Sequence, residues 1–499
     1  MALLDRRGFL KVGALGAAGS AVGWSFAPAH AQGPAITGEA ARTARNLIFM
    51  VSDGMSFGTL TLAEIVSQRT NKRPTNWVKL FAKAGVRRCA QNTSSADSLV
   101  TDSAAAASAW GSGFKVNNAA INVTPDGTQR LPILVHARQN GKATGVVSTA
   151  RVTHATPAGF YSNCADRSLE KNIAQDWLDR GIDLALGGGS EFFHSEMLAA
   201  HGELRIMRTA SDLKASIAAG NAPGERDRRW LGLFSRGHVP YELDRAASLA
   251  TDTPMDVPTL AEMSRAAIDR LSNSDRGKAG GFVLQIEGGR IDHAAHNNDA
   301  ASLVKEQLQF DETLGAVLDF VESRDDTLLI VTTDHGNANP GLTVYNAASY
   351  RSIDRLPRAT HSFDWIFEQL AGGTLDEKMD RLPGAVERAT SVAMKDADRD
   401  LMHRVLKGER VMPFDGLNIP TGVLGSILAN SFGVSFVSGH HTADQVELTL
   451  LGPGSERFPG EIENNDMHAI MVETLKLNAG ELLPGMDTKM RVKKPSASD

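Results

Sequence analysis

This 499-residue sequence has few cysteines, no excess of basic residues and no long apolar runs, and each of these excludes a class of protein. It has only two cysteines, Cys89 and Cys164, which excludes a disulfide framework and allows one disulfide at most. They are not spaced as a metal site, and we expect both to be unpaired and packed. The net charge of −6 provides no excess of basic residues, so we expect no nucleic acid as a specific partner.

Long apolar runs are also lacking. The best candidate, residues 12–27, is rich in glycine and alanine and shorter than the ~20 residues that a membrane helix needs. It follows the twin-arginine sequence RRGFLK at 6–11 and precedes the small-x-small sequence AHA at 29–31. We predict that residues 1–31 are a twin-arginine signal peptide, with a short membrane anchor as the alternative. The twin-arginine translocation machinery would then export a folded protein, which would be periplasmic or secreted.

Short apolar runs alternate with helical segments along the rest of the chain. The run 46–51 is typical of a strand buried on both faces. Similar runs occur at 143–148, 182–186, 282–286, 328–332 and 446–451. Helical spacing of apolar residues marks 300–323, and 259–271 is a second helical segment. The pattern predicts an α/β fold with a mostly parallel central sheet between two layers of helices.

One region interrupts this alternation. We expect residues 32–499 to form one catalytic domain, but 339–437 carries several prolines and charged helix-like runs such as 387–407. We interpret it as an inserted cap-like or crown-like region that covers the site or joins subunits. A packing appendage is an equally compatible interpretation. The tail 483–499 is rich in proline, lysine and serine, and we expect it to be frayed.

The densest group of potential metal ligands follows the predicted strand 282–286. Glu287 comes directly after that run, and Asp292 and His296 lie four residues apart. This spacing places both side chains on one face of a helix turn, where they can reach one cation. Open α/β sheets build their sites at this end of their strands. The sequence therefore predicts a metal site here.

Other candidate ligands follow other strands. Asp53 comes after the first strand, Asp334 and His335 after 328–332, and His441 near the end. Taken alone, Asp53 is most simply a turn aspartate, and Asp-His-Gly an ordinary left-handed turn. Asp334 and His335 can converge only if the backbone turns, which Gly336 would permit. Together with the first group, these ligands exceed one tetrahedral site and predict a two-metal cluster of zinc or a similar ion, with an oxygen-rich third site.

Ser103 is the candidate nucleophile. It begins an alanine-rich segment, where serine and aspartate also serve as ordinary helix caps. A helix N-terminus presents free N–H groups and partial positive charge to an anion. A serine at that point, next to a divalent ion, can ionise and attack phosphorus.

Together these motifs resemble the alkaline phosphatase family. They are VSDGM (51–55), TDSA (101–104), THATPA (153–158), LGGG (186–189), EGGRIDH (287–293), TDH (333–335) and HTA (441–443). Each is weak alone, but they follow the family's order and together are specific. The resemblance implies the alkaline-phosphatase-like fold and a homodimer. It also implies hydrolysis of small phosphate monoesters through a phosphoserine on Ser103.

The resemblance further implies two Zn²⁺ and one Mg²⁺. The first zinc would be held by Asp292, His296 and His441, and the second by Asp53, Asp334 and His335, in contact with Ser103. The magnesium would be held by Asp53, Thr156 and Glu287. Arg167 would hold the phosphate with its planar fork, oriented by Asp102, unless it is simply a surface charge at a helix start.

His154 and His293 depart from the best-known bacterial pattern, which has aspartate and lysine there, and resemble the animal enzymes. Imidazole favours zinc, so the third metal is either magnesium or zinc. Histidine also brings the charge beside the phosphate into its own titration range, and we expect an alkaline optimum.

Three rival functions share part of this pattern. A sulfatase of the same superfamily is disfavoured because its signature is missing around Ser103. A phosphodiesterase shares the metal ligands and stays open. A non-catalytic metal-binding or phosphate-binding protein would have no need of Ser103.

Overall fold

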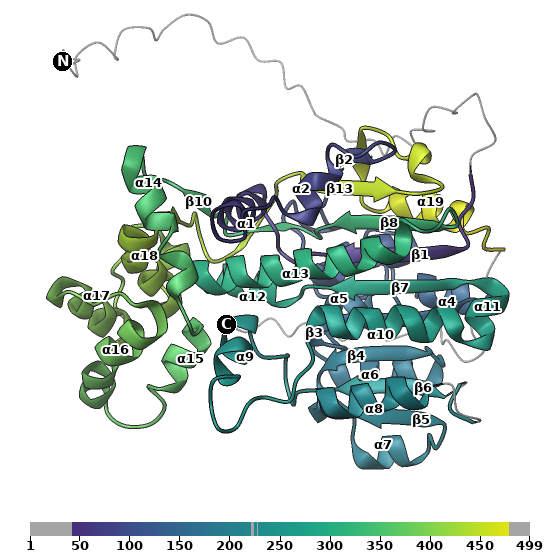
Figure 1. Cartoon of the computed structure of the whole chain (residues 1–499), viewed down its shortest axis with the longest axis horizontal. Coiled ribbons are helices and arrows are strands. Elements are labelled where there is room, and N and C mark those ends of the chain that lie inside the picture. Colours follow the sequence, from purple (N-terminus) through teal and green to yellow (C-terminus); the bar gives the residue numbers. More distant parts are fainter. Residues whose placement is uncertain (1–41, 221–223, 227, 479–499) are drawn as a thin grey trace, which may run out of the picture. The chain divides into compact units, whose positions relative to one another are not determined.

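The computed structural model of the chain describes residues 42–220, 224–226 and 228–478 (Figure 1). The predicted signal peptide, 1–31, and the predicted frayed tail, 483–499, lie outside the described residues, so both stay predictions. No helix in the described part of the chain has the length and apolar character to cross a bilayer.

A ten-stranded sheet forms the centre of the fold, in the order β14-β2-β13-β8-β1-β7-β3-β4-β6-β5. Every neighbouring pair is parallel except those that β13 makes with β2 and β8. The strands are β1 (Asn46–Val51), β2 (Arg87–Asn92), β3 (Ala143–Arg151), β4 (Leu184–Gly188), β5 (Leu204–Met207), β6 (Arg229–Leu233), β7 (Phe282–Glu287), β8 (Thr327–Thr332), β13 (Val446–Leu451) and β14 (Glu461–Glu463). The predicted mostly parallel sheet is confirmed. The strands β5, β6 and β14 were not predicted from the sequence, because each is short and contains at least one charged residue.

Side-chain alternation along the strands divides the core in two. On β1, Leu47, Phe49 and Val51 belong to one apolar cluster, while Ile48 and Met50 belong to the other. The first cluster is covered by α3 (Ser103–Ser112), α4 (Ile133–Gln139), α6 (Glu170–Asp179) and α19 (Asp466–Thr474). The second is covered by α1 (Phe57–Thr70), α2 (Asn76–Leu80), α10 (Leu260–Asn273) and α13 (Ala300–Val321). The three-layer arrangement is therefore confirmed (Figure 1).

The inserted region is helical and gathers at one end of the sheet, on the left in Figure 1. It contains α14 (Asn346–Ile353), α15 (Phe363–Glu368), α16 (Leu375–Thr390), α17 (Asp396–Leu406) and α18 (Pro420–Phe432), between the paired strands β10 (Gly341–Leu342) and β11 (Val434–Ser435). A third apolar cluster joins these helices to Val66 of α1 and Val304 of α13.

Within this region, 387–407 is not one helical run as expected. Ser391 takes a left-handed conformation with φ of 57° and ends α16, and a second helix starts at Asp396. The role of the region in covering the site or joining subunits stays a prediction.

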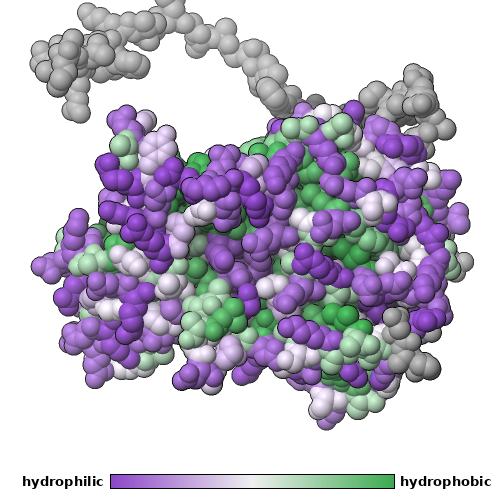
Figure 2. Space-filling model, viewed as in Figure 1, coloured by the Kyte–Doolittle hydropathy of each residue, from purple (hydrophilic) through white to green (hydrophobic). Residues whose placement is uncertain are grey.

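Hydrophilic residues surround several separate hydrophobic patches on the face shown in Figure 2. This pattern singles out no interface, and the homodimer stays a prediction. Cys89 and Cys164 are both buried and unpaired, as expected.

Glu306 of α13 is a buried acid outside the metal-ligand groups. Its Oε1 accepts a hydrogen bond from the backbone N–H of Glu242 at 2.5 Å, at the start of α9 (Glu242–Ser248). Burial raises the pKa of Glu306 to about 8. Between the unfolded pKa of about 4.3 and this value, the folded protein binds more protons than the unfolded chain, so rising pH lowers the free energy of unfolding.

Replacing Glu306 by glutamine should remove this dependence. As the pH rises from about 5 to about 9, we expect the free energy of unfolding of E306Q to increase relative to that of the parent protein by a few kcal/mol, on the order given by linkage. Urea unfolding midpoints across that range measure the difference. The exposed Glu312 on the same helix gives the control variant E312Q. A gap between parent and E306Q that does not change with pH would contradict the prediction.

Candidate active site

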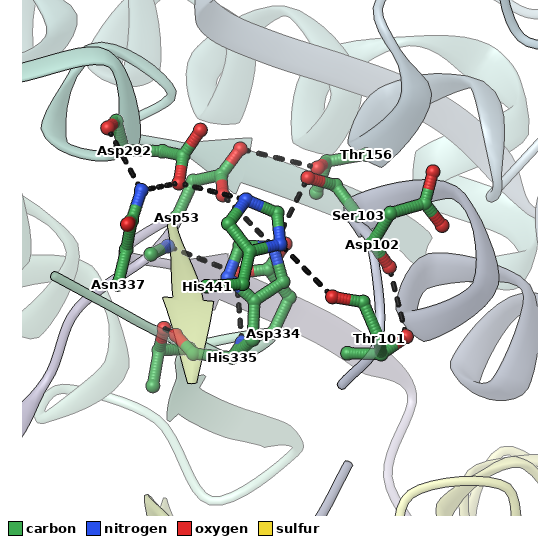
Figure 3. Close-up of polar contacts among 12 residues, drawn as sticks. Asp53, Thr101, Asp102, Ser103, Thr156, Asp292, Asp334, His335, Asn337 and His441 are labelled. Atoms are coloured by element: carbon green, nitrogen blue, oxygen red, sulfur yellow. Dashed lines mark hydrogen bonds and ion pairs between the residues drawn. The ribbon is translucent and has the colours of Figure 1, made fainter. Parts of the chain in front are cut away.

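The candidate ligands lie beyond the carboxyl ends of four neighbouring parallel strands, β8, β1, β7 and β3. Glu287 is the last residue of β7, and Asp53 follows β1 by two residues. Asp334 and His335 follow β8 by two and three residues. Because parallel strands end at one edge, their side chains meet there, as Figure 3 shows for Asp53 and Asp334.

Gly54 allows the end of β1 to approach α12 (Arg290–His296). Its φ is +67°, and a Cβ there would lie 2.4 Å from Asp292 Oδ1 and 2.9 Å from Asp292 Cα. Its N–H also donates to Asp334 Oδ1 at 3.0 Å. Glycine is therefore needed for both the backbone conformation and the close approach.

Asp292, His296 and His441 form the first group. His296 Nε2 lies 2.9 Å from His441 Nε2 and 3.3 Å from Asp292 Oδ2, and His441 Nε2 lies 3.5 Å from Asp292 Oδ1. The Nδ1 atoms of His296 and His441 face the carbonyls of Gly439 and Thr101, which directs both Nε2 atoms to the shared centre. Burial lowers the pKa of His296, but the Asp292 carboxylate raises it more, to about 9.

Asp53, Asp334 and His335 form the second group, completely buried. His335 Nε2 lies 3.0 Å from Asp334 Oδ2, 3.9 Å from Asp53 Oδ1 and 3.2 Å from Ser103 Oγ. The His335 ring also stacks on His441, with centroids 3.6 Å apart (Figure 3). The first two groups therefore adjoin, within reach of one hydroxyl.

The backbone bends at Asp334 and His335, as their convergence requires. No residue from Asp334 to Gly336 has a positive φ, so the alternative of an ordinary left-handed turn is wrong. β8 ends at Thr332, and Gly336 begins β9 (Gly336–Asn337), which pairs with β12 (His441–Thr442). A Cβ on Gly336 would lie 2.5 Å from Thr442 Oγ1. This glycine thus allows the close strand pairing that brings His441 to His335.

Asp53, His154 and Glu287 form a third group whose ligand atoms lie within 4.8 Å of one another. Thr156 Oγ1 donates to Asp53 Oδ2 at 3.4 Å, and Ser148 donates to Glu287. Burial, with the charges of Asp334, Asp292 and Glu287 added, raises the pKa of Asp53 well above its usual range. Burial also raises the pKa of Glu287 to about 7.

These groups fit divalent cations. Asp53 Oδ1, Glu287 Oε1 and His154 Nδ1 are buried without a hydrogen-bond partner. Burying carboxylates without compensation costs several kcal/mol each, and a cation removes that cost. The mixture of carboxylate and imidazole is the donor set expected for zinc or a similar ion.

The phosphate side of the site is built around Ser103, the first residue of α3. Asp102 caps this helix by accepting from the Ala105 N–H at 2.9 Å, and it also accepts from Arg167 Nη1 at 3.0 Å. Arg167 Nη2 lies 2.9 Å from His154 Nε2. Arg167 is thus held beside Ser103 and is not a free surface charge.

His238, which the sequence analysis missed, joins His154 and His293 in a cluster of three imidazoles. The ring of His238 lies 4.3 Å from that of His293 and 5.3 Å from that of His154. It lies in the loop after β6, where no spacing of ligand residues marks it. Burial lowers the pKa of His293 to about 3 and that of His154 well below its usual range. Burial thus favours the neutral form of both rings. The expected titration beside the phosphate and the alkaline optimum both stay predictions.

A family model described as alkaline phosphatase matches residues 44–363, well over half of the chain. The chain belongs to the alkaline phosphatase family. This family is metal-dependent, and hydrolysis of phosphate monoesters is its general activity. The predicted family and activity are thus confirmed.

The chain is similar to several alkaline phosphatases over most of its length. Alkaline phosphatase 3 of Bacillus subtilis is 29% identical over 442 residues, which covers 87% of this chain and 89% of the relative. The crystal structure of Thermus thermophilus alkaline phosphatase is 32% identical with a TM-score of 0.78, covering 88% and 92% of the two chains. A histidine-to-glutamate mutant of TAB5 alkaline phosphatase, with Mg bound in its M3 site, is 25% identical with a TM-score of 0.60, covering 88% and 100%.

Substituting Gly54 by alanine should separate β1 from α12. The added Cβ overlaps Asp292, in addition to the roughly 1–2 kcal/mol that a left-handed alanine costs. Gly85 provides the control, because its φ is +81° but nothing lies within 4 Å of a Cβ there. We expect G54A to lower the unfolding temperature clearly more than G85A, and to lower the bound metal content. Equal losses in the two variants would mean that Gly54 is not needed for the close approach.

Proposed function

We propose that this enzyme hydrolyses small phosphate monoesters through a phosphoserine on Ser103. One observation carries the proposal: Ser103 Oγ lies 3.2 Å from His335 Nε2, at the start of α3 and at the edge of the buried Asp53–Asp334–His335 group. A hydroxyl in that position can be activated by bound cations and can attack phosphorus.

We propose two Zn²⁺ and one Mg²⁺ as the metal ions. The first zinc has Asp292, His296 and His441 as ligands, and the second has Asp53, Asp334 and His335, with the Ser103 hydroxyl beside it. The oxygens of Asp53, Thr156 and Glu287 suit magnesium. His154 Nδ1 is unpartnered beside this third group, which supports zinc as the alternative there. When bound, the ions supply positive charge to the attacking and leaving oxygens.

The side chains then divide the work of phosphoryl transfer. The N–H groups at the start of α3 and the fork of Arg167 hold the phosphate oxygens, and Asp102 keeps Arg167 in place. His154 and His293 serve as further substrate contacts in this proposal: His154 Nε2 lies 2.9 Å from Arg167 Nη2, and the ring of His293 lies 5.6 Å from that of His154. Ser103 Oγ attacks phosphorus and the alcohol leaves. Water then attacks the phosphoserine and releases phosphate.

We also propose, from the sequence alone, that the protein is exported by the twin-arginine machinery, works in the periplasm or outside the cell, and forms a homodimer. The twin-arginine sequence at residues 6–11 supports export.

Ser103→Ala should reduce kcat by at least about a thousandfold, because the nucleophile is lost while charge stabilisation remains. The metal content should stay unchanged, since Ser103 is not needed to hold the ions. Release of p-nitrophenol from p-nitrophenyl phosphate measures kcat, and elemental analysis measures the metal content. Acid quenching of the parent enzyme should trap phosphate on a peptide that contains Ser103. Parent-like turnover in S103A would exclude this serine as the nucleophile.

His154→Asp should change the metal preference of the third site from zinc toward magnesium, because carboxylate is the harder ligand. The TAB5 mutant that holds Mg after a histidine was replaced by glutamate supports the direction. Elemental analysis after dialysis against equal zinc and magnesium measures the ratio, with His238→Asp as the control outside the third group. An unchanged ratio in H154D would show that His154 does not select the third ion.

A further inference from the structure

Arg290 connects the inserted region to the active site. It begins α12, and its side chain is only 10% exposed. Nη2 donates to Asp364 Oδ2 at 2.9 Å, and Nη1 lies 3.0 Å from His293 Nδ1. Among the described residues, Asp364 is the only carboxylate that forms an ion pair with Arg290. A buried cation at the edge of the site is therefore compensated from the insertion.

This contact determines how His293 presents its ring. A guanidinium can only donate hydrogen bonds, so Nδ1 of His293 must accept from Arg290. The ring proton then lies on Nε2, and His293 is a neutral donor through that nitrogen. His238 packs against the same ring edge-on, at 4.3 Å between centroids.

Arg290 has little freedom to move. Its guanidinium lies over the ring of Tyr241, 3.6 Å from the centroid. Asp364 is held as well, because it accepts from Asn297 Nδ2 at 3.2 Å. The start of α15 is anchored on the catalytic domain by two hydrogen bonds, from Ser362 Oγ to Asp244 at 2.6 Å and from the Phe363 N–H to Asp299 at 2.8 Å. The insertion thus holds Asp364 in one place relative to α12.

We propose that Asp364 is a positioning residue of the phosphate site, which acts through Arg290 to orient the Nε2–H of His293 toward bound phosphate. The inserted region therefore contributes to substrate binding although Asp364 does not contact substrate. This inference rests on the proposed function, in which His293 is a substrate contact.

The test compares Asp364→Asn, Asp364→Glu and Asp400→Asn. Asp400 lies on α17 of the same insertion, is 66% exposed and forms only a distant ion pair with Arg404, at 3.9 Å. Calorimetry gives the Kd of inorganic phosphate, and steady-state assays give KM and kcat for p-nitrophenyl phosphate. We expect D364N to raise Kd and KM about tenfold, as is typical when a supporting partner is lost. D364E should recover most of the loss, and D400N should match the parent enzyme.

A merely structural role for Asp364 would give a different result. Partial unfolding lowers kcat through the fraction of active enzyme and leaves KM and the phosphate Kd unchanged. A phosphate Kd in D364N within about twofold of the parent value would overturn the proposal. Failure of the proposed function would appear separately, as turnover in S103A equal to that of the parent enzyme.

Discussion

The fold depends on one electrostatic constraint, the burial of four carboxylates at one edge of a parallel sheet. Asp53, Glu287, Asp292 and Asp334 are all almost inaccessible to solvent. Their mutual repulsion and desolvation would be costly without compensating positive charge. Imidazoles provide part of it, and bound cations would provide the rest at the carboxylate oxygens that have no hydrogen-bond partner. Ions held by these carboxylates would lie beside Ser103, at the positive end of α3, where positive charge favours its ionisation to a nucleophile.

Much of this site could be predicted because its residues follow buried strands. The apolar runs of β1, β7 and β8 mark strands, and ligands at the carboxyl ends of adjacent parallel strands must meet. The four-residue spacing of Asp292 and His296 needs only the helix period. The strand order itself, which puts β1 between β7 and β8, is a tertiary property that no local pattern encodes.

Other features could not be predicted because they arise from contacts between distant segments. Gly336 follows the expected bend at Asp334 and His335, but its role in letting β9 and β12 approach closely has no signal in the sequence. His238 and Asp364 lie in a loop and in the insertion, without the spacing that marks a ligand. Only their contacts with His293 and Arg290 show that they belong to the surroundings of the site. The depth at which His154 and His293 are buried, which lowers the pKa of both rings, is likewise invisible in the sequence.

The central claim is that these carboxylates and imidazoles hold a pair of divalent ions beside Ser103. Anomalous X-ray diffraction at the zinc edge, on crystals of the protein as purified, tests it directly. The account predicts two strong peaks, one among Asp292, His296 and His441 and one among Asp53, Asp334 and His335. Peaks bound by other residues, or none at this edge of the sheet, would contradict it.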